Sequence, residues 1–116
     1  KDYLRIGGEN VSSSVVEDII RKNPAIKEVA VVGIKGELEN DEMVAHVVLN
    51  DDMSLGPEDF FEFCNKNMSY FMVPRYLVFR SEIPKTGTLR IEKYKLRKEK
   101  VGSAIDRNKL GVKLKR

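Results

Sequence analysis

The chain has 116 residues, of which 41% are hydrophobic and 34% are charged, and this length fits one compact domain with a modest core. Its longest apolar runs, such as 29–32 and 47–49, have the length of a strand and exclude a membrane-spanning helix. The formal net charge is +3, with basic residues crowded after Lys85, a pattern compatible with nucleic acid, with a nucleotide phosphate or with a solvated surface.

The first third of the chain predicts a short strand and then a helix. Tyr3–Ile6 is a strand-like run that ends at Gly7-Gly8, where glycine permits a positive φ or the close approach of another group. Ser14 and Glu17 have the spacing of a capping box, so we expect a helix to begin there. Asn23-Pro24 is expected to end it, because proline cannot continue the helical hydrogen bonds.

The remaining elements predict a small α+β domain. The valine-rich segments Glu28–Ile34 and Met43–Leu49 indicate strands covered on both faces. Gly56-Pro57 favours the start of a second helix, with proline at its first position. Tyr76–Phe79 follows as a third strand, and Ile91–Lys100 is a basic helical segment. We therefore expect a small three-stranded sheet with packed helices, plus a short N-terminal strand segment.

Two residues with reactive side chains have ordinary explanations. Cys64 is the single cysteine, so an internal disulfide is excluded and a reducing compartment, most simply the cytoplasm, is favoured. It lies on the same apolar helix face as Phe60 and Phe61, which indicates a core position. His46 lies in an apolar strand without a cluster of partners, so no metal site is predicted.

Two stretches at opposite ends of the domain carry a shared pattern. The first reads Lys-Asp-Tyr-Leu-Arg-Ile-Gly-Gly-Glu-Asn-Val over residues 1–11, and the second is Ile-Pro-Lys-Thr-Gly-Thr-Leu-Arg over residues 83–90 with a basic segment after it. They resemble the hinge motif and the C-terminal motif of acyl- and aryl-CoA synthetases, luciferases and peptide-synthetase adenylation domains. Residues 71–79 are similar to the segment before that second motif, and residues 106–113 resemble crotonobetaine/carnitine-CoA ligases.

The resemblance implies the C-terminal lid domain of an AMP-forming acyl-CoA synthetase, an acid–thiol ligase. Residues 1–100 are then the lid and 101–116 a basic tail. Such enzymes activate a small-molecule carboxylate as acyl-AMP with ATP, accompanied by Mg²⁺, and then transfer the acyl group to CoA. The partner of the lid is the N-terminal adenylation domain of the same polypeptide, so the isolated lid is expected to be inactive and to bind no cofactor alone.

In this family the lid rotates between the two steps and presents a different face in each. The resemblance places the hinge at Lys1 and Asp2. It places the border of the pantetheine tunnel, used in the thioester step, at the loop Gly7, Gly8, Glu9 and Asn10. An ordinary turn also accounts for the two glycines, so this alternative stays open.

In the adenylation step, the resemblance implies that the C-terminal loop brings a cation to the phosphate. Lys85, Thr86, Gly87 and Thr88 support this loop, and Arg90 falls on the family's catalytic lysine. Arginine keeps the charge but is a planar fork rather than a compact ammonium, and Leu89 replaces the motif glycine before it.

Three alternatives therefore remain at the sequence level. A shifted role for Lys85 or Lys93, or impaired adenylation, competes with Arg90 as the phosphate-facing cation. If adenylation is lost, the full-length protein is a noncatalytic relative of these enzymes. A freestanding basic module that binds RNA or a nucleotide would also explain the charged C-terminal end, although the central strands lack exposed aromatic residues for base stacking.

Overall fold

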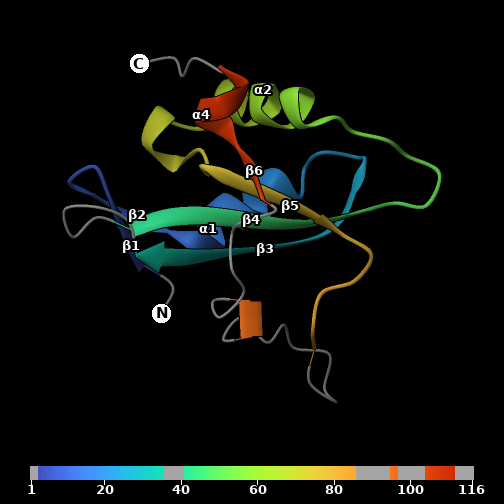
Figure 1. Cartoon of the computed structure of the whole chain (residues 1–116), viewed down its shortest axis with the longest axis horizontal. Coiled ribbons are helices and arrows are strands. Elements are labelled where there is room, and N and C mark those ends of the chain that lie inside the picture. Colours follow the sequence, from blue (N-terminus) through green and yellow to red (C-terminus); the bar gives the residue numbers. More distant parts are fainter. Residues whose placement is uncertain (1–2, 36–40, 86–94, 97–103, 112–116) are drawn as a thin grey trace.

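The computed structural model describes residues 3–35, 41–85, 95–96 and 104–111, and it confirms the α+β class (Figure 1). The elements in chain order are β1 (Tyr3–Ile6), β2 (Glu9–Ser12), α1 (Ser13–Ile20), β3 (Ile26–Lys35), β4 (Asp41–Leu49), α2 (Pro57–Asn67), the 3₁₀ turn η2 (Tyr70–Met72), β5 (Tyr76–Arg80), β6 (Ile105–Asp106) and α4 (Arg107–Leu110). Among the described residues, no helix is long and apolar enough to cross a membrane.

The main sheet has four strands in the order β3-β4-β5-β6, one more than the sequence predicted. β3 and β4 are antiparallel, whereas β4 and β5 are parallel and are connected through α2. The added strand, β6, is antiparallel to β5 and pairs Asp106 with Tyr76 and Ile105 with Leu77. Only two residues form it, too few for a periodic signal in the sequence.

Side chains on both faces of this sheet are buried, as the continuous valines predicted. On one face, a large core includes residues of the sheet, α1 and α2, namely Val16, Ile20, Val29, Val31, Val47, Phe60, Phe61, Cys64 and Leu77. On the other face, a smaller cluster consists of Ala30, Val32, Val44, Val48, Ile83 and Leu96. Neighbouring residues of β3 alternate between the two clusters because successive side chains of a strand point to opposite faces.

The start of α1 differs from the predicted capping box. Ser12, not Ser14, is the N-cap, and its hydroxyl accepts a hydrogen bond from the Val15 N–H at 3.5 Å. Glu17 instead turns inward, where its carboxylate accepts a 2.7 Å hydrogen bond from the Val31 N–H of β3. The buried carboxylate therefore connects the helix to the sheet, a long-range role that local spacing does not reveal.

The prediction for α2 is confirmed in detail. Gly56 is its N-cap and Pro57 occupies the first turn, where the missing N–H of proline costs nothing. Phe60, Phe61 and Cys64 are fully buried. The rings of Phe60 and Phe61 meet edge to face, with centroids 5.2 Å apart.

A separate hairpin of β1 and β2 lies against the main sheet. It pairs Ile6 with Glu9 across the two glycines, and its Leu4 side chain enters the large core. Gly33 of β3 leaves the space for Leu4, because a Cβ built at Gly33 would lie 2.3 Å from a methyl carbon of Leu4. The hairpin is also held by a hydrogen bond of 2.9 Å from the Arg5 N–H to the Asp41 carboxylate.

The C-terminal segment returns to the domain. β6 and α4 cover residues 105–110, within the region that the sequence assigned to a basic tail, and α4 lies near α2 at the top of Figure 1. Of the predicted basic helix, only Lys95 and Leu96 are described; both are helical, and Leu96 is buried. The other residues of that helix lie outside the described part of the chain.

Candidate functional site

The two glycines predicted to border a tunnel form the tip of the β1–β2 hairpin. Gly7 has φ 54° and Gly8 has φ 87°, which is the left-handed region that glycine adopts without strain. Two residues with positive φ between paired strands match the tight turn that the twist of a hairpin favours. A Cβ at either position would meet nothing within 4 Å, so backbone conformation, not crowding within this chain, requires glycine here.

A cavity of about 180 Å³ opens beside this turn. Its wall combines the end of β1, the start of β4, the segment around η2 and the C-terminal α4, and consists of Ile6, Gly7, Glu42, Met43, Tyr70, Phe71, Val73, Arg75 and Arg107. Tyr70 and Phe71 meet edge to face with centroids 5.5 Å apart. The cavity therefore has aromatic, aliphatic and charged walls together, and the glycine turn lies at its edge.

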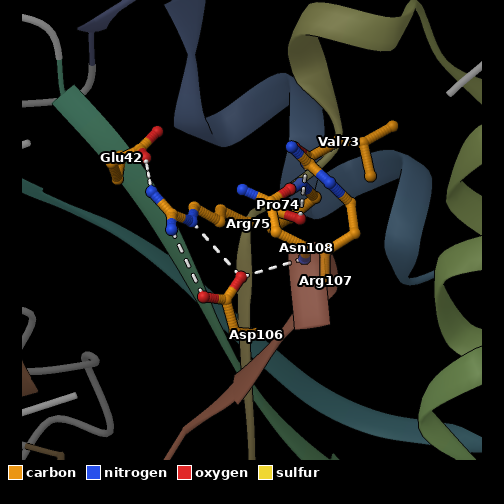
Figure 2. A network of polar contacts seen from close by, with 7 residues as sticks. All are labelled: Glu42, Val73, Pro74, Arg75, Asp106, Arg107 and Asn108. Carbon is orange, nitrogen blue, oxygen red and sulfur yellow. Dashed lines mark hydrogen bonds and ion pairs between the residues drawn. The ribbon is translucent and has the colours of Figure 1, made fainter. Parts of the chain in front are cut away.

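Arg75 is the centre of a polar network that reaches the cavity (Figure 2). Its guanidinium forms an ion pair with Glu42 and donates two hydrogen bonds of 3.3 Å to the two carboxylate oxygens of Asp106. It also lies over the Tyr76 ring, 5.0 Å from the centroid. Two carboxylates and one aromatic ring from three different strands thus fix the side chain of Arg75.

Arg107 makes the second set of contacts in this network. Its Nη1 donates to the carbonyl oxygens of Val73 at 2.8 Å and Pro74 at 3.1 Å, and its backbone N–H donates to the Arg75 carbonyl at 2.8 Å. Asp106 also caps α4, because its carboxylate accepts a 2.9 Å hydrogen bond from the Asn108 N–H. Two consecutive residues, Asp106 and Arg107, therefore hold three consecutive residues, 73–75.

The charges of the network nearly balance. The hydrogen bonds that Arg75 donates to Asp106 and Glu42 raise its pKa. Burial by itself would raise the pKa of Asp106, but its hydrogen bonds with Arg75 and the Asn108 N–H leave that pKa below its usual value. Burial lowers the pKa of Arg107, although a guanidinium remains charged at any physiological pH. Arg75, Arg107 and Glu42 line the cavity, and Asp106 pairs with Arg75, so the network of two cations and two anions makes the cavity polar without making it a strong anion site.

The structure places Lys85 away from this cavity. Lys85 forms an ion pair with Glu28 of β3, and it follows Ile83, which packs in the cluster on the second face of the sheet. The cavity instead adjoins the first core, through Met43 and Val73. The start of the predicted phosphate loop and the glycine turn therefore belong to different faces of the domain.

The other predicted site residues have mixed outcomes. Glu9 and Asn10 lie on β2, are exposed and do not line the cavity. Lys1 and Asp2 lie outside the described residues, as do 86–90, which include Thr86, Gly87, Thr88 and Arg90, so their roles stay predictions. Glu42, Arg75, Asp106 and Arg107 carry no signal of this network in the sequence, because their contacts join residues more than 30 positions apart.

Neither Cys64 nor His46 adds a reactive centre. Burial raises the pKa of the Cys64 thiol to about 12, although the positive charge of Arg107 lowers this pKa in part. A thiol with this pKa is a poor nucleophile near neutral pH. His46 is buried in β4, with its Nδ1 3.4 Å from a guanidinium nitrogen of Arg80. Within the described ranges, no three His, Cys, Asp or Glu side chains are placed to hold a metal ion.

The fold and the glycine turn define a known class of domain. The family described as the AMP-binding enzyme C-terminal domain matches residues 15–89, so the chain belongs to that family. Among curated proteins, a crotonobetaine/carnitine–CoA ligase of Salmonella arizonae is 44% identical over 96 residues, which are 83% of this chain and 19% of the relative. An Escherichia coli ligase of the same name is 43% identical over 84 residues, or 72% of this chain and 16% of the relative.

Solved structures of the family share this architecture. The Brucella canis acyl-CoA synthetase is 30% identical with a TM-score of 0.77, over 84% of this chain and 19% of that one. The amide bond synthetase McbA of Marinactinospora thermotolerans is 28% identical with a TM-score of 0.78, over 84% and 20% of the two chains. The chain thus spans about a fifth of the length of these relatives, and it resembles their C-terminal domain.

Proposed function

We propose that this chain is the mobile lid of an acid–thiol ligase, which makes an acyl adenylate from a carboxylate and ATP and then transfers the acyl group to CoA. Family membership and the ligase names of the curated relatives support this function. In the first step a carboxylate oxygen attacks the α-phosphorus of ATP and pyrophosphate leaves. In the second step the CoA sulfur attacks the acyl carbon, AMP leaves, and the thiol gives up its proton.

The observation that best supports the proposal is the separation of the glycine turn from Lys85 on one domain. The glycine turn lies beside the cavity on the side of the larger core, whereas Lys85, the first residue of the predicted phosphate loop, lies on the side of the smaller cluster. One domain that serves two successive steps needs a different surface for each. Rotation about the hinge predicted at Lys1 and Asp2 would exchange these surfaces at a single active site.

The cavity provides part of a path for the thiol cosubstrate. Drug-sized ligands occupy pockets of about 300–1,000 Å³, so a cavity of about 180 Å³ is a partial site that a second domain would complete. The pantetheine arm of CoA alternates amides with methylene and methyl groups, which suits walls that are both polar and apolar. The positive φ of Gly7 and Gly8 favours glycine, and glycine has no side chain to narrow the edge of this path.

The adenylation step accumulates negative charge on phosphate oxygens, which a cation at the tip of a loop stabilises. Arg90 is the proposed cation, supported by its position in the motif and its fixed charge. Mg²⁺ would be bound through the ATP phosphates, because the described residues offer it no cluster of ligands. The N-terminal domain of the same polypeptide would hold ATP and the acyl group, in the reducing environment of the cytoplasm.

The test uses the full-length enzyme and separates the two half-reactions. Wild type is assayed with a panel of carboxylic acids, including crotonobetaine and carnitine, for ATP–pyrophosphate exchange and for acyl-CoA formation. Arg90→Ala is expected to lower the exchange rate about 100-fold. Arg90→Lys is expected to retain the rate, because lysine and arginine both carry a positive charge. Gly8→Ala is expected to slow acyl-CoA formation and to preserve exchange, because a side chain strains the positive φ.

Each failure of this test has a distinct meaning. Normal exchange by Arg90→Ala removes the catalytic role from Arg90. A wild type that neither exchanges pyrophosphate nor forms a thioester with any acid refutes the ligase proposal and indicates a noncatalytic relative. Exchange with transfer to amines and not to CoA would indicate an amide-forming enzyme, the activity named for one structural relative. Salt-dependent RNA binding by the domain would favour the nucleic-acid alternative.

A further inference from the structure

Asp106 and Arg107 hold one wall of the cavity from a distant part of the sequence. They are more than 30 residues from Val73, Pro74 and Arg75 in sequence. The wall continues from these residues to Tyr70 and Phe71 of η2, directly before them in the chain. Figure 2 shows the Arg107 guanidinium directed at the carbonyl groups of Val73 and Pro74, whereas the Arg75 guanidinium points toward Glu42 and Asp106.

Few other hydrogen bonds hold the backbone of this segment. The Val73 N–H bonds the Tyr70 carbonyl at 3.4 Å, a long contact, and the Arg75 N–H bonds the Met43 carbonyl at 3.1 Å. Pro74 has no N–H to donate. The carbonyls of all three residues, by contrast, accept hydrogen bonds from Arg107, at 2.8 Å from its Nη1 to Val73, 3.1 Å from its Nη1 to Pro74 and 2.8 Å from its backbone N–H to Arg75. Arg107 therefore supplies hydrogen bonds to the backbone of all three wall residues, in addition to the burial of Val73 and the ion pairs of Arg75.

We infer that Arg107, supported by Asp106, is a positioning residue that sets the spacing between the Tyr70–Arg75 wall and the glycine turn for the CoA-dependent step. This inference rests on the proposed function. Although Arg107 also lines the cavity, its Nη1 donates to the carbonyls of Val73 and Pro74, so its effect on CoA is exerted through the wall. Loss of Arg107 would release the wall, while Lys85, which pairs with Glu28 on the other face of the domain, stays in place.

The experiment compares Arg107→Gln, Arg107→Lys and Asp106→Asn in the full-length enzyme. Lys109→Gln is the matched control, because Lys109 is on the same helix, is exposed and loses the same charge. Arg107→Gln is expected to raise the KM for CoA about 10-fold with ATP–pyrophosphate exchange within about 2-fold of wild type. Arg107→Lys restores part of the affinity because an ammonium still donates to a carbonyl, and Asp106→Asn gives an intermediate KM.

Hydrogen exchange supplies a second measurement that needs no turnover. The amides of Met72, Val73 and Arg75 are expected to exchange at least 5-fold faster in Arg107→Gln than in wild type, whereas amides of β3 are unchanged. An unchanged KM for CoA overturns the inference even if the melting temperature falls, because Arg107 then serves stability alone. A parallel loss of both half-reactions also overturns it. Absence of acyl-CoA formation by wild type refutes the proposed function and this inference with it.

Discussion

Gly33→Ala tests whether the glycine turn is held in place by the packing of one leucine. A Cβ at residue 33 would lie 2.3 Å from Leu4 Cδ2 and 3.3 Å from Leu4 Cδ1. Carbon atoms in contact prefer about 3.5–4.0 Å, so the leucine has to retreat by more than about 1 Å. Leu4 is only 9% exposed and its side chain packs in the large core, which leaves it little room to do so.

Overpacking of this kind costs about 1–3 kcal/mol of unfolding free energy. For a domain of 116 residues, a loss of 1 kcal/mol lowers the melting temperature by roughly 4 °C, so a decrease of about 4 °C or more is expected. Because Leu4 belongs to β1, its displacement also moves the hairpin that carries Gly7 and Gly8. In the full-length enzyme we therefore expect a slower thioester step with little change in pyrophosphate exchange.

The double variant with Leu4→Ala provides the control. Leu4→Ala alone leaves a cavity and destabilises by about 2–3 kcal/mol. In the double variant the new methyl group at residue 33 fills part of that cavity without a clash, so the double variant loses less stability than the sum of the single ones by about 1 kcal/mol or more. Calorimetry and chemical denaturation of the four proteins measure this coupling. An unchanged melting temperature for Gly33→Ala, or strictly additive losses, would refute the packing argument.

Two further predictions concern ionisable groups. The pKa of Asp106 is lower in the folded chain than in the unfolded chain. Its carboxylate therefore adds to the unfolding free energy above the unfolded pKa of about 3.9, and this stabilisation is lost as pH falls through the folded pKa. Asp106→Asn is therefore expected to lower the unfolding free energy by about 1 kcal/mol at pH 7 and to approach wild type near pH 2; a gap that persists at pH 2 would contradict this. The raised pKa of Cys64, about 12, leaves roughly one thiolate in 10⁴ at pH 8, so we expect a disulfide reagent to label it slowly in native buffer and rapidly in guanidinium. Rapid labelling of the native chain would show that the thiol is not buried as the structure has it.

The sequence predicted the helices and strands that are determined by residues close together in the chain. Pro57 with the apolar residues after it was enough to place α2, and the valines of β3 and β4 indicated strands buried on two faces. The sequence did not predict the short strands β2 and β6. β2 reads Glu-Asn-Val-Ser and β6 has two residues, so neither carries a periodic pattern. The capping box at Ser14 was wrong because three serines compete for one cap, and the hydrogen bond of Glu17 to β3 removes the second partner.

The candidate site divides in the same way. The motif around Gly7 and Gly8 was visible in the sequence, and the positive φ of both residues explains why glycine stands there. The wall opposite them was not visible. In the sequence, nothing distinguishes Arg75 from the other lysines and arginines, 21 in all. Its role follows from the fold, which places Glu42 and Asp106 of two separate strands beside it.

The sequence alone therefore determined the class of domain, since its motifs depend on residue type and spacing along the chain. Only the tertiary structure decided where those motifs face. The parallel pairing of β4 with β5, the return of β6 and α4 to the sheet, and the space at Gly33 for Leu4 all depend on contacts between residues far apart in the chain. Each such contact is a property of two distant residues together, and neither residue carries its signal alone.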